Sequence, residues 1–182
     1  MKTITEEILH WSEYFVEQKS KKLDGWAVCP YAQKARLTNK VKVVEVKSAD
    51  DFLFELTKEA RTIKDQEKEL IIVACDDFRM DIDALAYSVE ALNYTFVRDD
   101  IYLMPFHPYD DSEEVEFLED NLETENDFFM VLIQPFSKLE EASASLHKQG
   151  YYDNWDKQYY EDTVLKRQSY RRVYNDGQKQ KN

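Results

Sequence analysis

Residues 70–75 read Leu-Ile-Ile-Val-Ala-Cys, an uninterrupted apolar run with charged residues on both sides. A short run of this kind is typical of a central β-strand that is covered on both faces. Asp76 and Asp77 follow directly, so the strand is expected to end at Cys75. We therefore predict that this segment lies in the interior of a β-sheet.

Three further segments have the composition of strands. In residues 41–46 valines alternate with charged residues, and 101–106 are largely apolar. Residues 128–134 are apolar except for Gln134 and are followed by Pro135. Between these strands apolar residues recur at helical spacing, in two stripes made of Phe52, Leu56, Ala60 and Ile63, and of Ile82, Leu85, Val89 and Leu92. Strands mixed with helices predict an α/β fold.

Helices are also expected nearer the ends of the chain. Residues 3–6 form a capping-box pattern, and apolar spacing extends the predicted helix to about Lys19. Residues 137–140 repeat the capping pattern, and Gly150 suits the position after a helix C-terminus.

The chain has 182 residues, enough for one domain with a substantial core. We predict a single-domain α/β sandwich with a four-stranded mixed sheet, helices packed on it and a C-terminal tail helix. Residues 1–150 are expected to form the α/β domain and 151–182 the tail. The link between 101–106 and 128–134 lacks a full-length crossover helix, which predicts an antiparallel pair.

The tail is rich in tyrosine and in basic residues. We expect a docked helix over 156–174 and disorder in the last eight residues. Its basic side chains are expected to meet the acidic residues 110–127. The alternative is a small nucleic-acid-binding surface, in which arginine and tyrosine stack on bases.

The whole chain is acidic, with 37 acidic and 24 basic residues and a formal net charge of −13. This charge opposes binding to nucleic-acid backbone and to anionic lipid, and it permits a basic protein partner. No apolar stretch approaches the roughly 20 residues of a membrane span, and the acidic start does not resemble a signal peptide. With two cysteines and no disulfide framework, we expect a cytoplasmic protein.

Cys29 is the first candidate catalytic residue. It stands in residues 26–32, Trp-Ala-Val-Cys-Pro-Tyr-Ala. A thiol near the start of a helix can have a lowered pKa and act as a nucleophile. The alternative is a buried free cysteine that packs as a small apolar residue.

His107 is the second candidate catalytic residue. It lies at the end of a predicted strand, in residues 105–108, Pro-Phe-His-Pro. Imidazole titrates near neutral pH and suits general acid–base catalysis. The alternative is a histidine that is hydrogen-bonded at a strand end. If the fold brings Cys29 and His107 together, they form a thiol–imidazole pair.

The remaining candidates are aromatic and acidic. Trp26, Tyr31 and Phe106 are expected to line a small-molecule pocket. Asp76 and Asp110 follow predicted strands, where carboxylates can contact a substrate or orient an imidazole. The alternative, which the sequence favours, is that both lie in solvated turns. The chain contains no glycine-rich phosphate loop and no paired-cysteine zinc motif, so the sequence assigns no metal and leaves the cofactor unknown.

The two motifs resemble those of a small bacterial family defined by a domain of unknown function. Its members have an early Cys-Pro-Phe-Ala motif and a later Phe-His-Pro motif, and the corresponding residues here are 29–32 and 106–108. The resemblance covers roughly residues 8–135. The family continues into Arg-Ser-Pro-Tyr-Pro, which this chain lacks, so no role of that arginine carries over. The resemblance implies where a site lies and implies no activity.

Two main functions are compatible with these features. The first is a small-molecule enzyme in which Cys29 is the nucleophile and His107 the acid–base group, with an unknown substrate. The second is an acidic interaction protein in which residues 110–127 bind a basic partner or mimic nucleic acid. A third is an accessory protein that contacts RNA or DNA through its basic tail.

Overall fold

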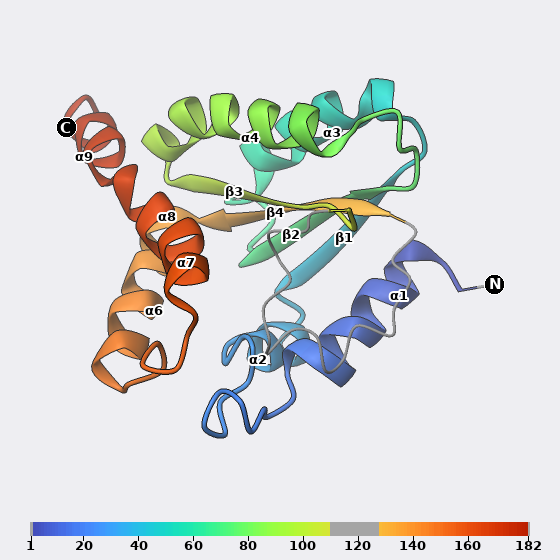
Figure 1. The fold of residues 1–182 in the computed structure, drawn as a ribbon. Coiled ribbons are helices and arrows are strands. Elements are labelled where there is room, and N and C mark those ends of the chain that lie inside the picture. The colour runs from blue at the N-terminus through green and yellow to red at the C-terminus, as the bar shows by residue number, and fades with distance from the viewer. Residues whose placement is uncertain (1, 110–127, 182) are drawn as a thin grey trace.

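The computed structural model describes residues 2–109 and 128–181 of the chain. Its centre is the predicted four-stranded mixed sheet, with the strand order β1-β2-β4-β3 (Figure 1). The strands are β1 (Val41–Val46), β2 (Leu70–Cys75), β3 (Ile101–Phe106) and β4 (Phe129–Pro135). Three of them have the predicted bounds, and β4 is shifted by one residue.

The direction of pairing determines which residues meet at each end of the sheet. β1 and β2 are parallel, and β4 is antiparallel to both β2 and β3, which confirms the predicted antiparallel pair. Because β4 lies between β2 and β3, the strands β1, β2 and β3 all point the same way. Their C-terminal ends lie together beside the start of β4, where Cys75 is opposite Phe129.

Helices cover both faces of the sheet, so the domain has three layers (Figure 1). α3 (Ala49–Thr62) and α4 (Ile82–Phe96) pack on one face, and α1 (Ile4–Trp11) packs on the other. The other elements are η1 (Ser12–Val16), α2 (Ala32–Leu37), η2 (Val97–Asp99), α6 (Phe136–Lys148), α7 (Lys157–Tyr160), η4 (Glu161–Leu165), α8 (Lys166–Ser169) and α9 (Arg171–Lys179).

Among residues 2–109 and 128–181, no helix combines the length and the apolar character that a membrane crossing requires.

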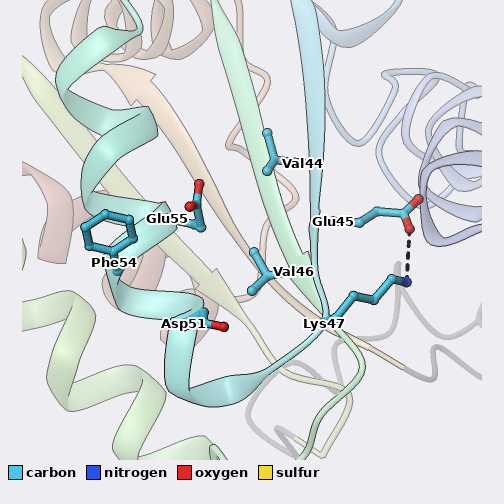
Figure 2. Close-up of a pocket in the computed structure, with 7 residues that line it drawn as sticks. All are labelled: Val44, Glu45, Val46, Lys47, Asp51, Phe54 and Glu55. Atoms are coloured by element: carbon cyan, nitrogen blue, oxygen red, sulfur yellow. Dashed lines mark hydrogen bonds and ion pairs between the residues drawn. The ribbon is translucent and has the colours of Figure 1, made fainter.

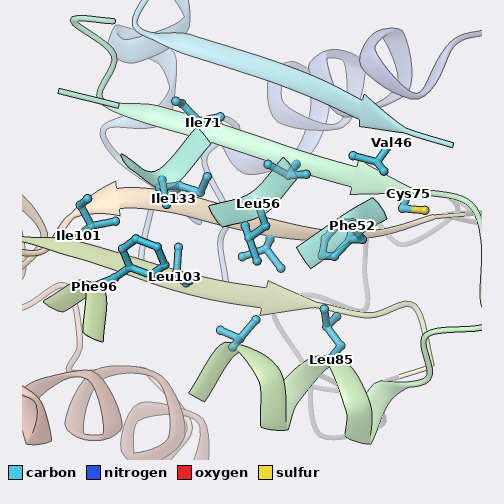
Figure 3. Close-up of a cluster of buried hydrophobic side chains, with 14 of the residues drawn as sticks. Val46, Phe52, Leu56, Ile71, Cys75, Leu85, Phe96, Ile101, Leu103 and Ile133 are labelled. Carbon is cyan, nitrogen blue, oxygen red and sulfur yellow. The ribbon is translucent and has the colours of Figure 1, made fainter. Parts of the chain in front are cut away.

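The core follows from the alternation of side chains along each strand. In β2, Ile71, Val73 and Cys75 pack against α3 and α4, whereas Ile72 and Ala74 pack on the face covered by α1. Figure 3 shows part of the larger cluster, which also contains Phe52, Leu56, Leu85, Leu103 and Ile133. Both faces of β2 are therefore buried, as the uninterrupted apolar run predicts.

The outer edge of β3 is closed by a buried side chain of α4. The Asn93 amide donates to the Leu103 carbonyl and accepts from the Leu103 N–H, both at 2.9 Å. Pro105, two residues further on, faces the same way along the strand and has no N–H to present. This edge therefore offers no continuous ladder to another strand.

α6 begins differently from the sequence prediction. The Ser137 hydroxyl donates to the Asp100 carboxylate at 2.9 Å, and the Ser137 N–H donates to the same carboxylate at 2.7 Å. Pro135 occupies the position before the helix and makes no side-chain cap. The predicted capping box at residues 137–140 is therefore wrong, because a carboxylate from the turn before β3 satisfies the first turn of α6.

The tail is helical to Lys179, so the prediction of a disordered end is wrong for the described residues. Gly177 lies so close to η2 that an added Cβ would be 2.7 Å from the Cα of Arg98. The side chains of Gln178 and Lys181 donate to the Arg98 carbonyl, each at 3.1 Å. These contacts hold the end of the chain against the domain.

Basic residues of the tail pair with the folded domain. The buried Arg167 donates to Glu140 at 2.9 Å and to Ser143 at 2.8 Å, and Arg171 also pairs with Glu140. Lys181 pairs with Asp99 at 2.7 Å. The predicted docking partner, residues 110–127, lies outside the described residues, and the partners of these three residues are in α6 and η2.

Replacing Asn93 with alanine should lower the free energy of unfolding by about 2–5 kcal/mol, because two buried backbone groups of Leu103 lose their partners. Urea unfolding followed by circular dichroism measures the change. Thr95→Ala, at an exposed position of the same helix, is the control and should change stability by less than about 0.5 kcal/mol. An equally small effect of Asn93→Ala would contradict the closure of β3 by this amide.

Candidate functional site

Cys29 lies in the loop before α2 and is enclosed by other parts of the chain. Its N–H donates to the Val16 carbonyl at 3.0 Å, and the neighbouring Val28 carbonyl accepts from the Tyr151 hydroxyl. Burial raises the pKa of the Cys29 thiol, backbone N–H groups oppose this weakly, and the carboxylate of Glu17 raises the pKa further. The surroundings therefore favour a neutral thiol over a thiolate.

Two of the predicted pocket residues, Trp26 and Tyr31, are close neighbours of Cys29 in the sequence. Trp26 packs edge-on against Tyr151, with ring centroids 5.6 Å apart, and joins an apolar cluster with Leu23 and Trp155. Tyr31 is 43% exposed and directly precedes α2. Trp26 thus packs the loop that contains Cys29 against the tail.

His107 directly follows β3 and is only 6% exposed. Its ring stacks on Phe129 at a centroid distance of 5.8 Å and meets Phe78 edge-on, also at 5.8 Å. Its Nδ1 accepts from the Tyr109 N–H at 3.3 Å. Among residues 2–109 and 128–181, its Nε2 has no hydrogen-bond partner. The ring is therefore held largely by aromatic packing.

Within residues 2–109 and 128–181, no hydrogen bond, ion pair or ring contact joins Cys29 to His107. His107 packs against Phe129, which belongs to the core under α3 and α4, whereas Cys29 is bonded to η1 on the side of α1 and α2. Phe106 points to the face covered by α1, opposite to His107, because neighbouring residues of a strand face opposite sides.

The carboxylates after β2 have separate surroundings. Asp77 accepts from the Ala49 N–H at the start of α3 and pairs with Arg79 at 2.6 Å, while Arg79 also reaches Asp50 at 3.0 Å. Hydrogen bonds from Arg79 hold the pKa of Asp77 well below its ordinary range. Asp77 therefore ties the start of α3 to the end of β2. Asp76 is exposed, and Asp110 lies outside the described residues.

The structure shows a hollow that sequence reasoning missed. It lies beside β1, has a volume of about 430 Å³ and is open to solvent (Figure 2). Val44 and Val46 form its apolar floor, and Figure 2 shows Glu55 and Asp51 on α3 as its wall. Glu45, Lys47 and Phe54, which is 69% exposed, complete the lining.

Two carboxylates, those of Asp51 and Glu55 on α3, lie on the side of β1 to which Val44 and Val46 point. The Glu45 carboxylate points to the opposite face, where it accepts from the Thr5 N–H at 2.9 Å and from the Thr5 hydroxyl at 2.7 Å. Lys47 approaches Glu45 at 3.4 Å, and Glu55 pairs with Lys58 at 2.7 Å outside the hollow. Asp51 has no ion pair within residues 2–109 and 128–181. The hollow therefore suits a cationic group with an apolar stem. It could not be found from sequence because it depends on β1 being an outer strand.

In the described parts of the chain, no group of three or more His, Cys, Asp or Glu side chains is placed to hold a metal ion. No family model, curated protein or solved structure matches the chain significantly. The family resemblance of the two motifs therefore stays a prediction.

Because burial raises the pKa of Cys29, its alkylation by iodoacetamide should be slow at neutral pH. The rate should keep rising above about pH 8.5, the pKa of an unperturbed thiol. Peptide mapping separates Cys29 from the buried Cys75, and His107→Ala should leave the rate unchanged. A thiol that reacts rapidly at neutral pH, and slows on His107→Ala, would contradict the separation of the two residues.

Proposed function

We propose that the protein is an acidic interaction protein that binds a basic protein partner. The observation that carries this proposal is the carboxylate-lined hollow beside β1, in a chain with a net charge of −13. An apolar floor with a carboxylate wall suits lysine or arginine, because their stems pack on apolar surface while their charged ends reach the carboxylates. The two free cysteines agree with a cytoplasmic location for this activity.

The overall charge supports the same partner. Excess negative charge attracts basic proteins over distances of about 10 Å at moderate salt and speeds their association. Residues 110–127 contribute ten carboxylates and no basic residue to the sequence, so they add to this attraction whatever their conformation. The same charge repels nucleic-acid backbone.

The geometry favours this function over the Cys29–His107 enzyme. A nucleophilic thiol needs a neighbouring base or positive charge. Cys29 instead has a raised pKa and the carboxylate of Glu17 nearby. His107 packs among aromatic rings, with Nδ1 accepting from a backbone N–H. In the part of the chain that the structure describes, no contact supplies either residue with the partner that catalysis requires.

Charge reversal in the hollow tests the proposal. The combination Asp51→Lys and Glu55→Lys should weaken binding of the blocked peptide Thr-Lys-Thr-Lys-Thr-Lys-Thr by at least about tenfold. At both positions the attraction between a carboxylate and the lysines of the peptide becomes repulsion between two positive charges. NMR titration at low salt measures the dissociation constant. The matched control reverses two exposed carboxylates elsewhere, Glu90→Lys and Glu141→Lys, and should weaken binding by about twofold or less.

Reversal at Glu113, Glu114 and Glu116 measures the contribution of residues 110–127 in the same titration. The peptide with glutamate in place of each lysine should not bind, and binding of the basic peptide should weaken as salt rises to about 0.3 M. Failure of the basic peptide to bind at low salt would reject the proposed function. Equal binding of the acidic peptide would reject it as well.

A further inference from the structure

β1 is an outer strand of the sheet, and within residues 2–109 and 128–181 its only strand partner is β2. We propose that its free edge accepts an extended segment of the basic partner as a fifth strand, with alternate lysine or arginine side chains entering the hollow. This inference rests on the proposed function and specifies how the partner binds. Addition of a peptide strand to an open sheet edge is a known mode of recognition.

The hydrogen bonds at the start of β2 show which backbone groups of β1 are available. The Leu70 N–H donates to the Lys40 carbonyl at 3.2 Å, so Lys40 faces β2. Because residues alternate in a strand, the N–H and carbonyl groups of Val41, Val43 and Glu45 point away from β2. Three consecutive sites for a main-chain ladder therefore lie along the outer edge.

The two edge strands of the sheet, β1 and β3, differ in whether they can pair with an added strand. At β3 the outward groups of Leu103 are bonded by Asn93, and Pro105 offers no N–H. β1 contains no proline, and no described side chain bonds the outward backbone groups of Val43. An added strand therefore finds a ladder at β1 and none at β3.

The hollow provides side-chain selectivity next to this edge. Val44 and Val46 point towards α3, so a strand added beside β1 places every second side chain on that side as well. Alternate residues of a strand are about 6.8 Å apart. Asp51 and Glu55 are one helical turn apart, about 6 Å along the helix axis. Two alternate basic side chains can therefore reach the two carboxylates together.

Charge decides between a basic partner and a second copy of the chain. Two copies would each bring a net charge of −13, and like charges on that scale repel. The hollow also presents carboxylates to the incoming strand, whereas β1 itself has the sequence Val-Lys-Val-Val-Glu-Val, with one lysine rather than alternate basic residues. The observations therefore favour a basic segment from another protein.

Peptides of equal charge test strand addition. The alternating peptide Thr-Lys-Thr-Lys-Thr-Lys-Thr should bind at least about tenfold more tightly than Lys-Lys-Lys-Thr-Thr-Thr-Thr, which has the same composition. Both peptides are blocked at their ends and are titrated into the full chain. Attraction by charge alone does not distinguish them, so equal affinities would overturn strand addition while leaving the proposed function intact.

Methylation of the peptide amides provides a second test that leaves the protein unchanged. Only one of the two alternating sets of peptide N–H groups faces β1, so N-methylation at threonine and at lysine should differ at least about tenfold in effect. The threonine set is the sensitive one for an antiparallel peptide and the lysine set for a parallel one. Equal effects of both sets would overturn strand addition.

Val43→Pro removes an outward N–H from β1, so it should weaken binding of the alternating peptide and leave binding of Lys-Lys-Lys-Thr-Thr-Thr-Thr unchanged. The unfolding transition of Val43→Pro shows whether the variant is folded. If it is not, the N-methylated peptides with the unaltered protein test strand addition instead. Loss of binding by both peptides in the unaltered protein would reject the proposed function and strand addition together. A dimer in sedimentation experiments on the free chain would also overturn the inference, because a second copy would then occupy the edge.

Discussion

The insertion of β4 between β2 and β3 is the constraint on which the rest of the structure depends. β4 returns antiparallel between two strands that point the same way, and it buries both of its faces. This arrangement places β2 at the centre and leaves β1 with a single neighbour. The position of the free edge, and with it the hollow, follows from the strand order.

The same strand order gives the sheet two unlike edges. One is closed by the Asn93 amide and by Pro105. The other, β1, has no second strand partner among the described residues and lies beside carboxylates of α3. Open edges favour association and are usually protected. On an acidic chain such an edge is expected to repel copies of itself and to attract basic segments, which limits self-association through the open edge.

The sequence predicts the elements well because each depends on local periodicity. The strands at 41–46, 70–75 and 101–106 match their predicted bounds, and the capping box at residues 3–6 is confirmed. Features that depend on distant partners could not be predicted. Asp100 replaces the expected cap of α6, and the hydroxyl of Tyr151 bonds beside Cys29 from 123 residues away along the chain. The order of the strands in the sheet also depends on contacts between distant parts of the chain, so it could not be predicted either.

Amide hydrogen exchange along β1 tests the central claim most directly. In the free protein the N–H groups of Val43 and Glu45 should exchange rapidly, whereas those of Val44 and Val46, which face β2, should be protected. Saturation with the alternating basic peptide should slow exchange at Val43 and Glu45 and leave Val44 and Val46 protected. Strong protection of Val43 and Glu45 in the free protein, or exchange there that the bound peptide does not slow, would contradict the account.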